Sequence, residues 1–283
     1  MTRSRPWLLA VLLLAGSLAF AAPATTQWLE APAEGWIDVT IYHHDTRSRF
    51  DYSREESPIQ NQGHAVATSL FLTGAVGLVR GIDLWLQLPY HRLRFDDAAR
   101  DRVSHGIGDP RVFLRMGPAA LGLPDMPVAV RAGYKSPQGD FDVDAEVIPL
   151  GEGQRDFELL VELGHSFYPR PIWAMGWVGY RWREENTVLA REPGNERFWH
   201  AAAGVEWQGV NWKGVVEGSK GHPWRIQNIR VPTSSREIVQ GLFSGSVPVG
   251  PGDAGAGVRV PFRGRNLPSG PAFFMSYFLR IGG

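Results

Sequence analysis

Hydrophobic and polar residues alternate with a period of two along most of the chain, and no segment carries the apolar stripe of an amphipathic helix. In the segment 155–166, for example, Leu159 and Val161 share one parity, whereas Glu158 and Glu162 share the other. Successive side chains of a β-strand point to opposite faces of the sheet. The pattern therefore predicts strands that have one apolar and one polar face.

Twelve such segments, bounded by Gly, Pro, Asn or Asp, are expected to be strands. They cover residues 36–44, 63–78, 81–95, 107–117, 127–136, 155–166, 172–183, 196–208, 211–219, 236–249, 252–263 and 271–281. Their connections alternate in length, because the charged segments 45–62 and 137–154 are long, whereas 79–81, 209–210 and 250–251 are tight turns. Bacterial outer-membrane barrels place long loops at one end and short turns at the other. The alternation predicts an antiparallel up-and-down barrel with both termini at the short-turn end.

Alternation alone fits both a soluble barrel, which turns its apolar face inward, and a membrane barrel, which turns that face toward lipid. Small residues on the apolar faces, such as Ala201, Ala203, Gly214 and Gly245, favour the membrane barrel, since a shared core needs bulkier side chains. Aromatic residues near the strand ends also fit a girdle at the lipid headgroups. These are Trp36, Tyr90, Tyr134, Tyr180, Trp182, Trp199, Trp207, Trp212 and Tyr277. The expected fold class is all-β: a single transmembrane antiparallel up-and-down barrel of about 12 strands.

The N-terminus has the features of a secretory signal peptide. Arg3 and Arg5 precede the short apolar run 7–15, and the small-x-small segment 19–21 offers a cleavage site. We expect residues 1–21 to be the signal peptide and residues 22–283 to form the barrel. The expected location is the cell outer membrane of a Gram-negative bacterium, and the expected partners are its lipid bilayer, the outer-membrane assembly machinery and a small-molecule solute.

Composition narrows the function further. The chain has no cysteine, which excludes disulfides, thiolate metal sites, a cysteine nucleophile and a lipoprotein anchor. The 29 basic and 29 acidic residues balance, so no nucleic-acid partner is indicated. No cofactor is expected.

The middle of the chain, roughly 65–281, carries short Gly-rich motifs in a characteristic order. They are Gly-Ile-Gly-Asp at 106–109, Lys-Ser-Pro-Gln-Gly-Asp at 135–140, Pro-Leu-Gly-Glu-Gly-Gln-Arg-Asp at 149–156, Gly-Tyr-Arg at 179–181 and Gly-Arg-Asn-Leu-Pro-Ser-Gly at 264–270. In these motifs the chain resembles the outer-membrane family named for the putative MetA pathway of phenol degradation. The resemblance implies a barrel that passes small molecules, hydrophobic or aromatic ones among them. The chain departs from many such barrels at its end, where Ile281 and two glycines replace a terminal aromatic residue.

Charged residues of the polar parity are expected to line the lumen. They are Asp83, Asp109, Arg111, Arg115, Arg131, Lys135, Glu158, Glu162, Arg181, Arg183, His200, Glu206, Lys213, Glu217, Arg259 and Arg263. The nine Arg and Lys residues exceed the six Asp and Glu residues, which predicts a solute-selecting lining with a weak preference for anions. Alternatively, cross-strand ion pairs of Arg115 and Arg131 with Glu158 or Glu162 plug the lumen, and the barrel has a structural or surface-interaction role.

A lipid-modifying hydrolase is a third hypothesis, and the sequence supports it poorly. Such an enzyme needs a serine and a histidine within hydrogen-bond reach. His165 and Ser166 are adjacent in one strand and therefore face opposite sides, and no inward serine stands out beside His200. We predict that the protein is not an enzyme.

Metal binding is also not expected. His43 and His44 are adjacent rather than spaced for one ion. Four acidic residues alternate in the long loop 137–154, but no glycine lies at the centre of the run to curl it around calcium. These residues are Asp140, Asp142, Asp144 and Glu146. A solvated acidic loop is the interpretation that fits them.

Overall fold

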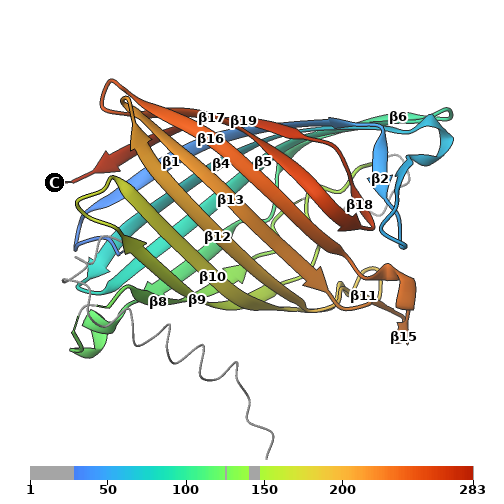
Figure 1. Ribbon diagram of the computed structural model, residues 1–283. Coiled ribbons are helices and arrows are strands. Elements are labelled where there is room, and N and C mark those ends of the chain that lie inside the picture. Colours follow the sequence, from blue (N-terminus) through green and yellow to red (C-terminus); the bar gives the residue numbers. More distant parts are fainter. Residues whose placement is uncertain (1–28, 125, 140–146, 283) are drawn as a thin grey trace, which may run out of the picture.

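A computed structural model, which describes residues 29–124, 126–139 and 147–282, shows a closed all-β barrel (Figure 1). Neighbouring strands pair antiparallel, and the sheet closes because β1 pairs with β4 on one side and β19 on the other. The strands of the wall, in chain order, are β1 (Gly35–Thr46), β4 (His64–Val79), β5 (Ile82–Asp96), β6 (Asp101–Ile107), β7 (Arg111–Met116), β8 (Val128–Lys135), β9 (Asp156–Ser166), β10 (Ile172–Arg183), β12 (Glu196–Trp207), β13 (Val210–Gly221), β16 (Glu237–Val249), β17 (Gly252–Arg265) and β19 (Ala272–Ile281).

The strands β6 and β7 share one position in this wall. β7 pairs with the first half of β5 and β6 with its second half, and the chain breaks between them at 108–110. The 13 strands of the described sheet therefore fill twelve positions, which confirms the predicted fold class. The expectation that the segment 96–106, which lies between two predicted strands, is a connecting loop is wrong, because β6 pairs with the second half of β5.

The two ends of the barrel differ as predicted (Figure 1). At one end the turns are tight, and Gly81, Gly209 and Gly250 adopt the positive φ angles of 80°, 74° and 62° that such turns require. The long connections at the other end form two small sheets. One contains β2 (Ser48–Phe50), β3 (Glu56–Pro58) and β18 (Leu267–Pro268), and the other contains β11 (Arg191–Glu192), β14 (Arg225–Ile226) and β15 (Ile229–Arg230). We call the two ends the short-turn end and the loop end.

Helix is confined to single turns. The described 3₁₀ segments are η2 (Gln60–Gln62), η3 (Pro118–Leu121) and η4 (Pro232–Ser234). None of the helices in the described ranges is long and apolar enough to cross a membrane.

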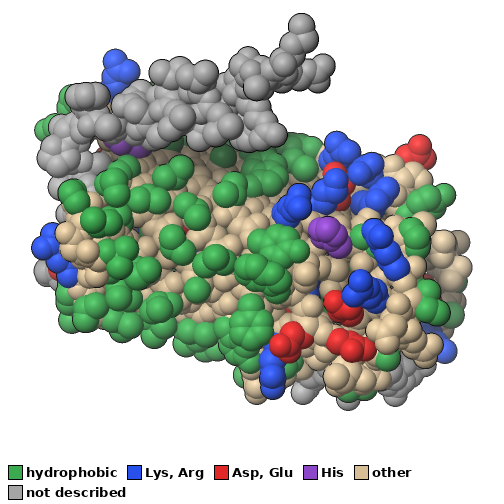
Figure 2. Space-filling model, turned by 90° about the horizontal axis from the view of Figure 1, so that it is seen from below, with side chains coloured by type: hydrophobic (Ala, Val, Ile, Leu, Met, Phe, Trp, Pro, Cys, Tyr) green, Lys and Arg blue, Asp and Glu red, His purple; other side chains and the backbone are tan. Residues whose placement is uncertain are grey.

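Apolar side chains cover the outside of the wall. Val130, Leu159 and Val161 are 37%, 45% and 43% exposed, whereas Leu160, which faces inward from β9, is 2% exposed. Figure 2 shows apolar side chains spread over the middle of the wall and most charged side chains gathered toward one end. This is the face assignment of a membrane barrel. Trp36 is an exception to the predicted aromatic girdle, because it faces inward and its ring lies 5.0 Å from that of Trp85.

Candidate functional site

The inner face carries two clusters of ion pairs, and the first lies toward the short-turn end. Arg115 on β7 is its centre: its Nε lies 2.7 Å from Oε2 of Glu162 on β9, and its Nη1 lies 3.3 Å from Oδ2 of Asp83 on β5. Arg131 on β8 adds a third ion pair, with 3.2 Å between its Nε and Oε1 of Glu162. The guanidinium groups of Arg115 and Arg131 each lie 5.1 Å from the ring centre of Trp85. We call this set the short-turn cluster.

The segment that precedes β1 contacts this cluster, which the sequence did not indicate. The backbone N–H of Glu30 donates a hydrogen bond of 3.2 Å to Oδ2 of Asp83. Gly117 and Gly77 leave the space for this segment, because a Cβ on Gly117 would overlap Leu29 and one on Gly77 would overlap the Ala31 carbonyl. The segment therefore packs against the short-turn end of the lumen.

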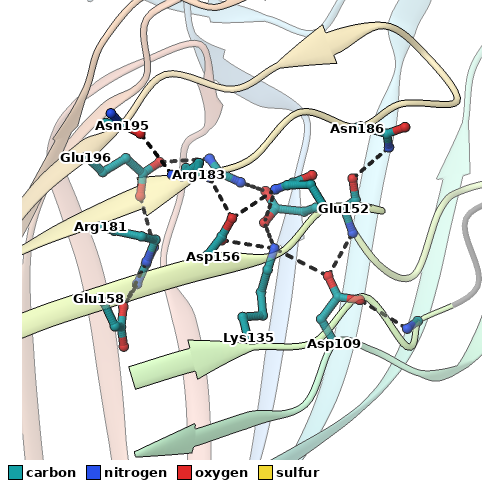
Figure 3. A network of polar contacts seen from close by, with 12 residues as sticks. Asp109, Lys135, Glu152, Asp156, Glu158, Arg181, Arg183, Asn186, Asn195 and Glu196 are labelled. Carbon is teal, nitrogen blue, oxygen red and sulfur yellow. Dashed lines mark hydrogen bonds and ion pairs between the residues drawn. The ribbon is translucent and has the colours of Figure 1, made fainter. Parts of the chain in front are cut away.

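The second cluster lies toward the loop end and is larger (Figure 3). Nζ of Lys135 lies 3.0 Å from Oδ2 of Asp156 and 3.4 Å from Oδ2 of Asp109. On β10, Arg183 lies 3.5 Å from Asp156 and 3.0 Å from Glu196 on β12. We call this set, together with Arg181, Glu158 and Glu152, the loop-end cluster.

Arg181 extends the loop-end cluster into the membrane-spanning wall. Its Nη2 lies 2.8 Å from Oε2 of Glu158, and its Nη1 lies 2.9 Å from Oε2 of Glu196. Two carboxylates on neighbouring strands thus hold one guanidinium from both sides. Such charge-assisted pairs fix side-chain positions as well as neutralise charge.

Glu152 comes from a loop, and sequence reasoning missed its role. Its carboxylate lies 2.5 Å from Nζ of Lys135 and 2.5 Å from Nη2 of Arg183. Its backbone N–H donates a 2.9 Å hydrogen bond to Oδ2 of Asp109, and its carbonyl accepts one of 2.9 Å from Nδ2 of Asn186. Burial alone would raise the pKa of Glu152, but the Arg183 and Lys135 cations outweigh it and hold that pKa well below its ordinary range.

The opposite side of the lumen centres on Glu217 of β13. Its carboxylate accepts a hydrogen bond of 2.7 Å from Nε2 of Gln240, lies 3.1 Å from Nδ1 of His200 and lies 3.6 Å from Nε of Arg259. The Arg259 guanidinium in turn lies 4.8 Å from the ring centre of Tyr42. The lining on this side is more neutral than that on β7 to β10.

Two expected lumen residues lie in other surroundings, and a third, Lys213, faces the lumen but is exposed. Arg263 follows a bulge in the pairing of β16 with β17, which shifts the alternation by one residue, so it pairs with Glu237 at 3.2 Å and its side chain is 55% exposed. That expectation was wrong. Glu206 has the inward parity but is exposed at the end of β12. Lys213 has the same parity as Glu217, is exposed, and interacts electrostatically with Asp38 and Glu217.

The ion pairs in the membrane-spanning part of the wall run along its inner surface and do not cross the interior of the barrel. Each of those described there joins strands that are neighbours in the sheet or one strand apart. The expected cross-strand pairs of Arg115 and Arg131 are present, both with Glu162, and they lie along the wall rather than between opposite sides of the barrel. The longest reach is made by Glu152 at the loop end, which lies 3.9 Å from Nη1 of Arg236 beside β16.

Two adjoining cavities lie inside the barrel. The first, of about 430 Å³, has aromatic walls formed by Trp85, Phe113, Trp177 and Phe198. The second, of about 660 Å³, reaches the loop-end cluster and is more polar. Both are lined by Arg111, Thr73, Gln87, Trp177 and Glu217, so these residues mark the place where the cavities meet.

A serine–histidine pair is present that the sequence analysis did not find. Ser69 on β4 and His91 on β5 are opposite each other in the pairing register, and Oγ of Ser69 lies 2.8 Å from Nδ1 of His91. A hydrolytic triad also needs an acid or amide on the second ring nitrogen. That nitrogen lies against the backbone of Gly108, and no carboxylate among the described residues is hydrogen-bonded to it.

No group of three or more potential metal ligands gathers among the residues that the structure describes. The acidic run 140–146 lies outside the described residues.

Solved structures with a similar fold include outer-membrane proteins. The chain is similar to an outer membrane channel from Pseudomonas putida F1, with a TM-score of 0.71 and 13% sequence identity over 92% of this chain and 100% of that one. Less similar are the CymD monoaromatic hydrocarbon channel (TM-score 0.44, 9% identity, 95% and 93% of the two chains) and the translocator domain of the autotransporter NalP from Neisseria meningitidis (TM-score 0.49, 11% identity, 98% of each chain). No family model and no curated protein matches the sequence. The first likeness shows a shared barrel fold.

Proposed function

We propose that the protein is an outer-membrane channel of a Gram-negative bacterium that passes small hydrophobic or aromatic molecules. The observation that supports this most directly is the pair of adjoining cavities inside a closed barrel. Their aromatic walls suit a planar apolar ring, and the polar groups between those walls suit a few directed hydrogen bonds. Ion pairs that follow the wall leave these cavities free.

Two further elements belong to the same proposal. Residues 1–21 direct export and are removed, and 22–283 insert into the bilayer with the help of the outer-membrane assembly machinery. The Gly-rich motifs that resemble the family of the putative MetA pathway of phenol degradation point to the same class of solute, and the fold shared with the Pseudomonas putida outer membrane channel is consistent with a channel. On this proposal the protein carries no enzymatic activity and the charged lumen residues set solute preference.

A structural barrel with a closed lumen is the second candidate, and one observation favours it. Glu152 binds Lys135 and Arg183 and approaches Arg236, so the described residues 147–155 before β9 lie at the loop end of the lumen. If these residues stay in place, they prevent solutes from entering the two cavities, whatever the cavities could bind. The loop-end cluster therefore decides between the two candidates.

Conductance of the purified mature protein in a planar bilayer tests the proposal. A channel gives discrete openings, and Thr73→Trp, which fills the junction of the two cavities, reduces them. The matched control is Thr68→Trp on the same strand, because Thr68 has the outward parity and its hydroxyl binds His43 at the rim. Absence of conductance in the wild type would favour the structural barrel.

A further inference from the structure

Among the described inward cations of β7 to β10, one is left without a partner by the two clusters. Arg115, Arg131, Arg181 and Arg183 each contact at least one carboxylate. Within the described ranges, Arg111 on β7 makes no hydrogen bond and no ion pair. Its electrostatic interactions are repulsion by Arg181 and attraction by carboxylates that other cations already hold, Glu158 first among them.

A second unused donor lines the first cavity. Nε1 of Trp85 is buried and has no hydrogen-bond partner within the described chain. Trp85 lines the same cavity as Arg111. A buried donor without an acceptor is costly, so such groups call for a partner from outside the chain. These groups lack a hydrogen-bond acceptor, and the positive charge of the Arg111 guanidinium favours an anionic acceptor.

The cavity walls specify the rest of the ligand. Trp177 contacts both cavities, and its ring stacks on His200 at 4.9 Å between centres and packs edge-on against Phe198 at 5.4 Å. Rings held in this way offer faces and edges to another aromatic ring. A volume of about 430 Å³ falls within the usual range for small-molecule sites and accommodates a single ring with its substituent.

We propose that the junction of the two cavities is a binding site for a small aromatic carboxylate, with Arg111 as its anion-binding residue. A guanidinium binds a carboxylate through two parallel N–H···O hydrogen bonds, a geometry that a neutral substituent does not provide. The ring lies in the first cavity, against Trp177 and Phe113. This rests on the proposed channel function and deepens it, because it names aromatic acids as a class of permeating solute.

Binding of benzoate to the full mature protein in detergent micelles tests the site. Isothermal titration calorimetry should show saturable binding to the wild type, and Arg111→Gln should weaken it at least about tenfold, which corresponds to about 1.4 kcal/mol. Arg111→Lys keeps the charge without the fork of donors and should give an intermediate affinity. It also covers the case in which Arg111→Gln fails to fold.

Lys213→Gln is the matched control, because Lys213 is a lumen cation that lines neither of the two cavities. It removes the same charge as Arg111→Gln and should leave benzoate affinity within about twofold of the wild type. Equal losses in the two variants would overturn the site and attribute the effect to the general potential of the lumen. Benzamide, which has the same ring without the charge, should bind weakly and equally to the wild type and Arg111→Gln.

Two results contradict the proposal outright. One is no saturable benzoate binding to the wild type, and the other is unchanged affinity in both Arg111 variants. Acetate that competes as well as benzoate would refute the aromatic class. Conductance of the same preparations separates this inference from the channel proposal. Conductance without benzoate binding would refute only the proposed binding site. Benzoate binding without conductance would refute only the proposed channel function.

Discussion

The assignment of lipid-facing and lumen-facing residues can be tested on two adjacent positions of β16. Phe243 lies at the middle of this 13-residue strand, is 56% exposed and has the outward parity. Ser244 follows it with the inward parity and pairs with Lys213 across the sheet. The same substitution to arginine at these two positions therefore places a charge at one depth on opposite sides of the wall.

Phe243→Arg should be much the more costly of the two. An arginine on the lipid face near the bilayer midplane costs about 2–4 kcal/mol, which lowers the ratio of folded to unfolded protein roughly 30- to 700-fold. Loss of the phenyl ring's lipid contact adds to this cost. Ser244→Arg places the guanidinium in a polar lumen and should change the free energy of unfolding by less than about 1 kcal/mol.

Reversible urea unfolding from phospholipid vesicles, followed by tryptophan fluorescence, measures both values. Val161→Arg on β9 repeats the lipid-face test on another part of the wall, where Val161 pairs with the outward residues Val130 and Val178. Equal tolerance of arginine at Phe243 and Ser244 would refute the membrane orientation of the wall. A larger cost at Ser244 than at Phe243 would invert it and indicate a soluble barrel with an apolar core.

Three further predictions concern the two ion-pair clusters. Glu152→Gln weakens the contacts with Lys135 and Arg183, so single-channel conductance in a planar bilayer should rise. Because the pKa of Glu152 is lowered in the folded protein, its ion pairs stay complete above the ordinary carboxyl range and are lost only as pH falls through the lowered pKa. Conductance measured from about pH 8 to about pH 5 should therefore show no Glu152-dependent step. Glu162→Gln leaves the buried Arg115 short of a partner and should lower the free energy of unfolding in urea by about 3–5 kcal/mol, whereas Asp101→Asn at the exposed rim should have no measurable effect.

Much of the wall could be predicted from sequence because its signal is local. Alternation within a strand fixes which side chains share a face, and Glu158, Leu159 and Val161 lie on the faces that their parity predicts. The polar sequence of β6 does not carry the alternation that predicts a strand. A polar strand still forms when it completes a hairpin, and β6 pairs with β5 over Tyr90 to Asp96.

Contacts between segments far apart in sequence could not be predicted. Glu152 lies in an irregular loop, and its partner Arg183 is on the strand after next, so no periodicity connects them. The Glu30 contact with Asp83 likewise depends on where the chain enters the barrel. Ser69 and His91 meet because of the register of β4 against β5, which the alternation pattern leaves open.

The ion pairs of the lumen change how its charge should be interpreted. Counting inward residues by parity gave more Arg and Lys than Asp and Glu, but Arg263 lies elsewhere and Glu152 and Glu196 bring additional carboxylates. A paired charge contributes little to the potential that a passing solute meets, since its field is cancelled within a few ångströms. Ion selectivity should therefore depend on the charged side chains that remain unpaired rather than on the total number of charged residues in the lumen. Arg111 is such a group at the junction of the two cavities, which makes anion preference a local property of that position.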